Sequence, residues 1–191
     1  MNKNVTEIIF LLDRSGSMEG LEEDTIGGFN AFINKQRQLA GETMVTTVLF
    51  DDQYEILWNG VNAEEVRLTN DNYFVRGSTA LLDAVGKTIL EVGHRLAKTK
   101  EPGKVIFVIT TDGQENASRE FTYKKVKELI RHQQEKYSWE FIFLGANIDV
   151  AREADSLGIS MEQTFSFEAS KHGVEAMYEM VCEAVSEKRV L

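Results

Sequence analysis

Apolar runs of strand length alternate with amphipathic stretches along the whole chain. Six runs are rich in apolar and β-branched residues and predict strands at 5–12, 43–50, 54–58, 105–109, 139–144 and 164–167. In the stretches between them, apolar residues recur with the spacing of one helix face, which predicts helices at 20–39, 79–97, 119–137, 150–157 and 171–185.

The order of these elements is β-α-β-β-α-β-α-β-α-β-α, which is typical of a mostly parallel sheet with helices on both faces. The runs 5–12 and 105–109 are almost entirely apolar, as expected for strands that are covered on both sides. A single tight turn, Asp51-Asp52-Gln53, joins two neighbouring strands and predicts one antiparallel strand at an edge. We therefore expect an α/β fold with a doubly wound sheet.

Nothing along the 191 residues marks a boundary between domains. The sequence has one proline, Pro102, and it contains no internal repeat and no linker rich in serine and glycine. A chain of this length buries roughly 70% of its unfolded surface, which is enough for one full core. We expect a single domain over residues 1–191.

The charge balance narrows the classes of partner. Asp and Glu number 31 against 21 Lys and Arg, which gives a net charge of −10. This negative net charge disfavours binding to nucleic acid or to an anionic membrane, because contacts with phosphate groups need clustered basic residues. The single Cys182 excludes a disulfide framework within the chain. The apolar run near the N-terminus stops at Asp13, too early for a signal peptide. We expect a cytoplasmic protein that binds neither nucleic acid nor membrane.

Polar residues collect where predicted strands end. Asp13-Arg14-Ser15-Gly16-Ser17 follows the first strand, Thr110-Thr111-Asp112-Gly113 closes the most apolar strand, and Arg76-Gly77-Ser78-Thr79 precedes a helix. Strand ends of a parallel sheet meet at one edge, where ligands bind. The candidate ligand atoms in these segments are all oxygens of Asp, Ser and Thr, and His and Cys are absent, which favours Mg²⁺, Mn²⁺ or Ca²⁺ over zinc or copper.

Three segments carry a resemblance to a known family: Asp13-x-Ser15-x-Ser17, Gly77-Ser78-Thr79-Ala80-Leu81 and Thr111-Asp112-Gly113. They are similar to the metal-ion-dependent adhesion site of von Willebrand factor A domains, and the resemblance extends to the order of elements over nearly the whole chain. It implies a six-stranded, doubly wound sheet whose hairpin strand is antiparallel at one edge. It also implies a divalent cation, Mg²⁺ or else Mn²⁺ or Ca²⁺, held directly by the hydroxyl groups of Ser15, Ser17 and Thr79. Asp13 and Asp112 then act through water.

The resemblance implies a binding module and not an enzyme. The cation accepts a carboxylate from an Asp or Glu of a partner protein, and the surrounding loops set specificity. Within the family the chain is most similar to the small stand-alone von Willebrand A proteins of bacteria and phages, because it shows no signal, no attached repeats and no disulfide pair near its termini.

A Mg²⁺-dependent phosphohydrolase of the haloacid-dehalogenase type is the alternative. Such enzymes also place an aspartate after the first strand of a doubly wound sheet. They need a second aspartate two residues later as a general acid, and that position is Ser15 here. A serine hydrolase is disfavoured because the chain has no Gly-x-Ser-x-Gly motif.

Several residues near the candidate site have simpler structural interpretations. Ser78 is expected to be the N-cap of a helix that begins at Thr79, and Asp149 is expected to cap the helix 150–157. Asp83 is expected to compensate the positive end of its helix. Glu115 and Asn116 are expected to shape the rim of the site or to cap the helix near Arg119.

Three further expectations concern packing. Arg14 is expected to point to solvent, where it would face an acidic partner. Tyr73 and Phe74, in the long connection 59–77, are expected either to recognise a partner or to be buried under the loop. The pair Gly27-Gly28 is unfavourable within a helix and is expected to mark close packing against the sheet.

Overall fold

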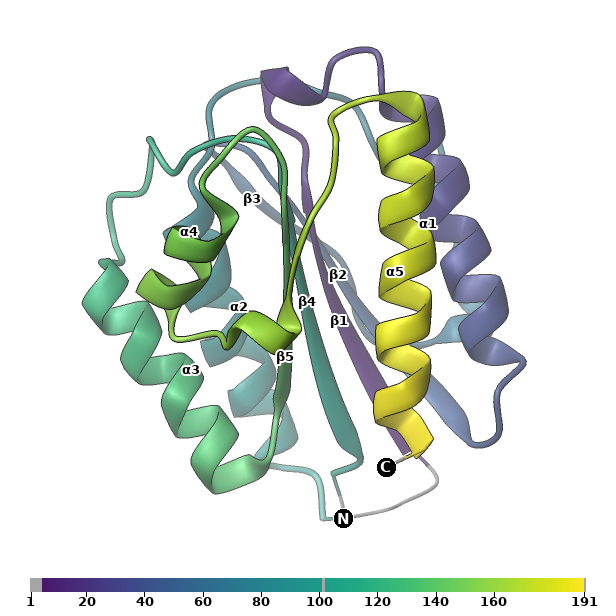
Figure 1. The fold of residues 1–191 in the computed structure, drawn as a ribbon. Coiled ribbons are helices and arrows are strands. Elements are labelled where there is room, and N and C mark those ends of the chain that lie inside the picture. Colours follow the sequence, from purple (N-terminus) through teal and green to yellow (C-terminus); the bar gives the residue numbers. More distant parts are fainter. Residues whose placement is uncertain (1–4, 101, 191) are drawn as a thin grey trace.

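A computed structural model describes residues 5–100 and 102–190, in which one sheet lies between two layers of helices (Figure 1). The strands are β1 (Val5–Asp13), β2 (Glu42–Phe50), β3 (Tyr54–Asn62), β4 (Lys104–Thr111), β5 (Glu140–Gly145) and β6 (Thr164–Ser166). The helices are α1 (Glu22–Arg37), α2 (Leu81–Leu96), α3 (Tyr123–Tyr137), α4 (Val150–Leu157) and α5 (Lys171–Val190).

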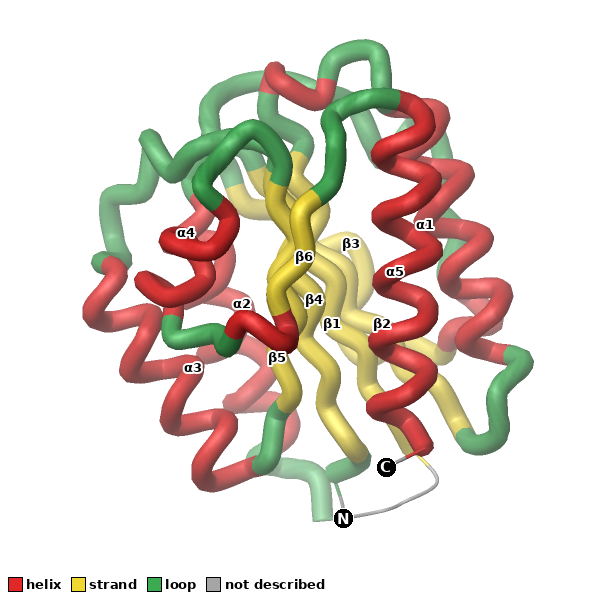
Figure 2. The backbone as a smooth tube through the Cα atoms, viewed as in Figure 1, coloured by secondary structure: helices red, strands yellow, loops and turns green. Residues whose placement is uncertain are grey.

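The sheet has the strand order β3-β2-β1-β4-β5-β6, and only β3 runs antiparallel to its neighbour. The predicted doubly wound, mostly parallel six-stranded sheet with one antiparallel edge strand is confirmed. The order reverses between β1 and β4, which lie side by side. Figure 2 shows the loops that follow these strands gathered at one end of the sheet.

The continuous apolar run in β1 exists because both faces of the sheet are covered. Ile8, Phe10 and Leu12 point toward α1 and α5, whereas Ile9 and Leu11 point toward the layer of α2, α3 and α4. Each of these side chains is at most 1% exposed. Side chains of successive strand residues alternate between faces, so in the central part of a strand that is covered on both sides, here Ile8 to Leu12, every position is apolar.

The helices differ from the predicted bounds where long-range bonds hold their first turns. The helix predicted from Thr79 begins at Leu81, so Ser78 is not its N-cap; that position is Ala80, whose side chain makes no capping bond. The amide of Leu82 instead donates to Glu115 (3.0 Å), in the loop after β4.

The helix predicted from residue 119 begins at Tyr123, with Thr122 as its N-cap. The amide groups of Arg119, Glu120 and Phe121 donate to the carboxyl group of Asp83 at 2.9–3.0 Å. Asp83 does lie in the first turn of α2, but its carboxyl group also binds the irregular segment 119–121 that precedes α3.

Gly28 marks close packing, although against α5 and not against the sheet as predicted. A Cβ atom at Gly28 would lie 2.2 Å from Cδ2 of Tyr178, and the α1–α5 contact therefore requires glycine there. A Cβ atom at Gly27 would meet nothing within 4 Å. The prediction that Asp149 caps α4 is confirmed, because its carboxyl group accepts from the amide of Arg152 at 3.1 Å.

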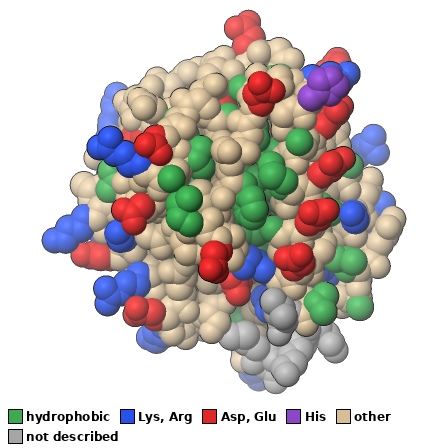
Figure 3. Space-filling model, in the orientation of Figure 1, with side chains coloured by type: hydrophobic (Ala, Val, Ile, Leu, Met, Phe, Trp, Pro, Cys, Tyr) green, Lys and Arg blue, Asp and Glu red, His purple; other side chains and the backbone are tan. Residues whose placement is uncertain are grey.

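Part of the negative charge is displayed on the outer side of α5 (Figure 3). Glu175, Glu179 and Glu183 are exposed there and recur every four residues. Within residues 5–100 and 102–190, the helices are all too short or too polar to cross a membrane.

Candidate metal centre

The two predicted carboxylates lie at the carboxyl ends of the adjacent strands β1 and β4. Asp13 ends β1, and Asp112 directly follows β4. The hydroxyl group of Thr111 donates to Oδ2 of Asp13 at 2.7 Å, while the amide of Ser15 donates to Oδ1 at 2.8 Å. Both oxygens of Asp13 are thus held in place by groups from the same sheet edge.

The two serines turn back toward Asp112. The backbone at Ser15 is extended, and a short 3₁₀ turn over Gly16–Met18 then brings Ser17 beside it. The hydroxyl oxygens of Ser15 and Ser17 are 3.1 Å apart, and the Ser17 hydroxyl donates to Oδ1 of Asp112 at 2.6 Å. Oδ2 of Asp112 is buried and has no hydrogen-bond partner in the described part of the chain.

Thr79 is held next to this cluster by the loop after β4. Its amide donates to Oδ1 of Asn116 (2.9 Å), and its carbonyl oxygen accepts from the amides of Asn116 and Ala117. A Cβ atom at Gly113 would lie 3.3 Å from Oγ1 of Thr79 and 3.5 Å from Oγ of Ser17. Both hydroxyl groups therefore border the same small space beside Gly113.

The electrostatics of the site favour an added positive charge. Burial raises the pKa of Asp112 to about 6; the hydrogen bond from Ser17 opposes this shift, and the neighbouring charge of Asp13 adds to it. Burial also raises the pKa of Asp13. In residues 5–100 and 102–190 neither carboxyl group forms an ion pair with Lys or Arg. A bound cation would stabilise the ionised form of both groups.

The donor set fits a small divalent cation. Asp13, Ser15, Ser17 and Asp112 are brought together by direct hydrogen bonds, and Thr79 borders the same space. All donors are oxygens, as Mg²⁺ and Mn²⁺ prefer, and the unpaired Oδ2 of Asp112 lacks the partner that an ion or its water would supply. The described residues contain no cluster of three or more His, Cys, Asp or Glu that suits another kind of metal site.

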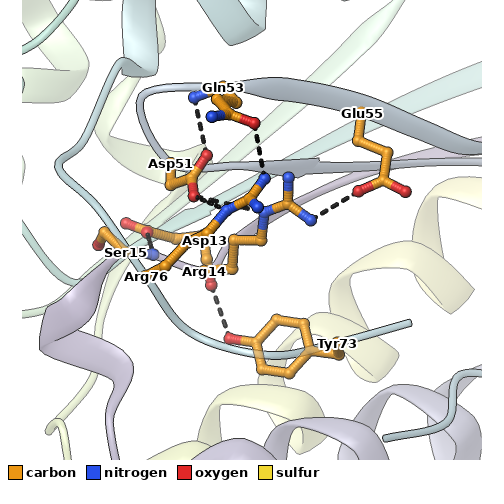
Figure 4. Close-up of polar contacts among 8 residues, drawn as sticks. All are labelled: Asp13, Arg14, Ser15, Asp51, Gln53, Glu55, Tyr73 and Arg76. Atoms are coloured by element: carbon orange, nitrogen blue, oxygen red, sulfur yellow. Dashed lines mark hydrogen bonds and ion pairs between the residues drawn. The ribbon is translucent and has the colours of Figure 1, made fainter. Parts of the chain in front are cut away.

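Arg14 is not exposed, which corrects the prediction that it points to solvent. Its side chain is fully buried between the site and the β2–β3 hairpin (Figure 4). Nη1 lies 2.7 Å from Oε2 of Glu55, and Nε lies 3.7 Å from Oδ2 of the buried Asp51. Because side chains alternate along the chain, Asp13 and Ser15 face the site while Arg14 faces the hairpin.

The predicted recognition loop divides into a buried and an exposed part. Tyr73 is buried, and its hydroxyl group donates to the carbonyl oxygen of Asp13 at 2.7 Å. Phe74 is 44% exposed and lies beside both Arg14 and Arg76, whose guanidinium carbons are 5.5 and 5.3 Å from the ring centre. Arg76 in turn donates to Oδ2 of Asp51 at 2.7 Å.

Sequence reasoning missed some of the bonds that support the site from outside. Thr111 and Tyr73 bind Asp13, and Asn116 positions Thr79. Thr111 stood beside Asp112 in the motif, so its place at a strand end was a usable signal. Asn116 was expected either to shape the rim of the site or to cap a helix near Arg119, and its bond to Thr79 agrees with the first alternative; its exact partner depends on how the loop after β4 folds over α2.

Neither a protein-family model nor a curated protein sequence matches the chain. Solved structures do match. One is proximal thread matrix protein 1 (PTMP1) from the mussel byssus, with a TM-score of 0.69 and 18% identity over 95% of this chain. The same protein with a zinc-occupied MIDAS motif gives 0.67 and 18% over 94%. This chain spans 46% and 45% of those two chains, less than half of their length.

Manganese-loaded TRAP protein of Plasmodium vivax also matches, with a TM-score of 0.62 and 14% identity over 91% of this chain and 72% of that one. The chain has the von Willebrand A-type fold. At these identities the similarity shows the fold alone, and the zinc and the manganese are properties of the other proteins.

In this von Willebrand A-type fold the site also receives a residue from the loop after β5. Asn147 has a left-handed backbone with φ of 57°, and its side-chain amide donates to the carbonyl oxygen of Asp112 at 3.2 Å. Residues at the ends of β1, β4 and β5 therefore all contribute hydrogen bonds around Asp112.

Proposed function

We propose that this protein is a metal-dependent protein-interaction module and not an enzyme. The observation that carries the proposal is the pairing of Asp112 with Ser17, which leaves the buried Oδ2 of Asp112 without a hydrogen-bond partner among the described residues, next to three hydroxyl groups. The zinc-occupied MIDAS motif of PTMP1 and the manganese of TRAP support a divalent cation on this fold.

The residues of this chain would hold the cation in two ways, directly and through water. The hydroxyl oxygens of Ser15, Ser17 and Thr79 are the direct ligands in this proposal, and Asp13 and Asp112 act through water. When bound, the cation supplies an electron-poor centre for a carboxylate from a partner. Thr111 keeps the Asp13 carboxyl group oriented, so the site needs little rearrangement to bind.

The partner in this proposal is a protein that presents an Asp or Glu to the cation. Phe74 and Arg76 lie on the exposed side of the adjacent loop and would contact residues that flank the acidic one. The phosphohydrolase alternative lacks its general acid, since Ser15 stands at that position and its hydroxyl pairs with Ser17. We further propose Mg²⁺ as the cation, the cytoplasm as the location, and a role like that of the small stand-alone von Willebrand A proteins of bacteria and phages.

Thermal unfolding of the wild type in EDTA and in excess Mg²⁺ or Mn²⁺ tests the metal. At roughly 100 times the dissociation constant the ion adds about 2.7 kcal/mol, which raises Tm by roughly 5 to 10 °C for a domain of this size. Asp112→Ala should abolish the shift, and Asp155→Ala, an exposed aspartate in α4, should keep it. A wild type whose Tm is the same in EDTA and in both cations would overturn the proposal.

Selection from a displayed peptide library, run in parallel with Mg²⁺ and with EDTA, tests the carboxylate. Peptides recovered only with Mg²⁺ should share one acidic residue, and its replacement by Asn or Gln should abolish binding. Binders that lack an acidic residue and tolerate EDTA would contradict the proposed mode of recognition.

A further inference from the structure

A groove runs between α1 and α5, on the face of the sheet opposite α2, α3 and α4. The two helices lie side by side, and both begin at the end of the sheet that carries the candidate metal centre (Figure 1). The groove has a volume of about 550 Å³. Its uncharged lining consists of Gly27, Gly28, Ala31, Phe32, Tyr178 and Cys182. This α1–α5 groove has room for the side chains along one face of a third helix.

Carboxyl groups stand along both sides of the α1–α5 groove. The charged residues that line it are Glu23, Asp24 and Lys35 of α1 and Glu175, Glu179 and Glu183 of α5, which gives five negative charges and one positive charge. Within residues 5–100 and 102–190, the only ion pair made by any of the six joins Glu175 to His172 at 3.6 Å. The groove therefore presents a negative potential to a partner.

The row of glutamates on α5 is unfavourable for the chain on its own. Glu175, Glu179 and Glu183 are exposed and four residues apart, so neighbouring carboxylates on one helix face repel each other. They lie beyond the first turn of α5, where the helix dipole would favour a negative charge. A helix rises 1.5 Å per residue, so the row has a spacing of about 6 Å. Cations with the same spacing would relieve the repulsion.

Gly27 is a second feature that the fold itself does not explain. It lies in the interior of α1 and is exposed, and a Cβ atom there would meet nothing within 4 Å. Glycine at such a position weakens a helix relative to alanine. The ring of Tyr178 requires glycine at position 28, but no described neighbour requires it at position 27. Gly27 and the exposed Ala31 would let the backbone of another helix approach α1 closely.

We propose that the α1–α5 groove binds a helix of a partner protein that carries Lys or Arg every four residues along one face. The cationic row would pair with the glutamates of α5, and the apolar face beside it would pack on Gly27 and Ala31. Charge complementarity selects a cationic helix over an anionic one. The open space at Gly27 selects a closely packed helix over a flexible basic tail. The proposal does not depend on the metal centre.

Two synthetic helical peptides of opposite charge test the proposal. One is built of Leu-Ala-Ala-Lys repeats and the other of Leu-Ala-Ala-Glu repeats, and each is added to ¹⁵N-labelled full-length protein in EDTA, so that no metal takes part. The lysine peptide should shift the backbone amide signals of Gly27 and Gly28, because it packs against them, and the glutamate peptide should shift neither. Equal shifts with both peptides, or no shift with the lysine peptide at millimolar concentration, would overturn the proposal.

Charge variants separate the groove from a general attraction between a cationic peptide and an acidic protein. The double variant Glu179→Gln/Glu183→Gln should bind the lysine peptide about fivefold more weakly, the loss expected for two exposed ion pairs. The matched control Glu128→Gln/Glu162→Gln removes the same charge from exposed positions outside the groove and should leave the affinity nearly unchanged. An equal loss of affinity in the two double variants would refute the role of the α5 glutamates.

Gly27→Leu tests the close approach to α1. The leucine side chain fills the open space and should abolish binding of the lysine peptide, while its higher helix propensity should raise the Tm of the free protein. Ala151→Leu, at an exposed position of α4, is the control and should bind as the wild type does. Wild-type affinity in Gly27→Leu would contradict the proposal. Sedimentation velocity of the free protein should show a monomer; a dimer that Gly27→Leu abolishes would place a second copy of this chain in the groove and overturn the assignment to a partner helix.

Discussion

The hydroxyl group of Ser17 donates to Oδ1 of Asp112 at 2.6 Å, while Oδ2 of the same carboxyl group is buried and finds no hydrogen-bond partner within residues 5–100 and 102–190. One side chain thus joins the loop after β1 to the loop after β4. Only one of the two carboxylate oxygens of Asp112 accepts a hydrogen bond from the described residues. We therefore expect the stability of the metal-free protein to depend on pH.

The metal-free protein should lose stability as the pH rises from about 4 to about 6. Burial raises the pKa of Asp112 from 3.8 to about 6, so in this window the folded state binds a proton that the unfolded state has lost. The stabilising contribution is complete below pH 4 and is lost above pH 6; the shift corresponds to about 3 kcal/mol, which solvent screening of the partly accessible carboxyl group reduces to about 2 kcal/mol. Urea unfolding in EDTA across this range measures it. In Asp112→Asn the loss over the same window should be smaller, and an equal loss in both proteins would refute the assignment.

Thr111→Val should weaken metal binding although Thr111 is not a proposed ligand. The substitution removes the hydroxyl group that donates to Oδ2 of Asp13 at 2.7 Å, so the carboxyl group loses its orientation. Loss of such a supporting bond lowers metal affinity about tenfold to a hundredfold. Thr110→Val is the matched control, because its hydroxyl donates to the carbonyl oxygen of Leu11 and not to Asp13. Calorimetric titration with Mn²⁺ should show a change in the first variant alone.

Arg14→Ala should destabilise the fold much more than Arg76→Ala. Both guanidinium groups face the fully buried carboxyl group of Asp51, but Arg14 is itself buried and Arg76 is partly exposed. Arg14→Ala removes a fully buried side chain and leaves a cavity, which costs about 3 kcal/mol. Arg76→Ala breaks a 2.7 Å bond to Asp51, but it opens a partly exposed place to water and leaves Arg14 3.7 Å from Asp51, so it should cost about 1 kcal/mol. Chemical denaturation of the two variants compares them directly. Equal losses of stability would mean that Arg76 alone neutralises Asp51.

Replacing each of the two neighbouring glycines of α1 with alanine should change the stability of the protein in opposite directions. Gly28→Ala places a methyl group 2.2 Å from the ring of Tyr178 and should destabilise by about 1–3 kcal/mol, because α1 and α5 must move apart. Gly27→Ala meets nothing within 4 Å and should stabilise by roughly 0.5–1 kcal/mol through helix propensity. Thermal unfolding of both variants decides the matter, and a stabilised Gly28→Ala would contradict the packing described above.

The sheet could be predicted from the sequence because its signal is local. The unbroken apolar run in β1 and the turn at Asp51 are visible in short stretches, and they were sufficient to predict a mostly parallel sheet with one antiparallel edge strand, whereas a single sheet of six strands was implied by the resemblance. The meeting of Asp13 with Asp112 followed from the rule that parallel strands end at one edge. The place of Thr79 beside them came from the resemblance, and the structure puts it at the same space.

The errors share a cause, which is bonding between residues far apart in the sequence. The start of α3 was misplaced because Asp83 binds the amides of residues 119–121, more than thirty positions away. Arg14 was misplaced because its partners Asp51 and Glu55 come together only when the β2–β3 hairpin forms. Serine is a common N-cap residue, but Ser78 does not cap α2. The amide of Leu82, in the first turn of α2, donates instead to the carboxyl group of Glu115 in the loop after β4.

The loop that carries Phe74 is tied to the metal centre by bonds between main-chain atoms. The amide of Arg76 donates to the carbonyl oxygen of Arg14, and that of Gly16 donates to the carbonyl oxygen of Gly77. Main-chain bonds do not depend on which side chain either residue carries, so substitutions at Phe74, which takes part in neither bond, should not displace the residues of the candidate metal centre. Over evolutionary time, the exposed surface around Phe74 can therefore change while the residues of the candidate metal centre are inherited unaltered.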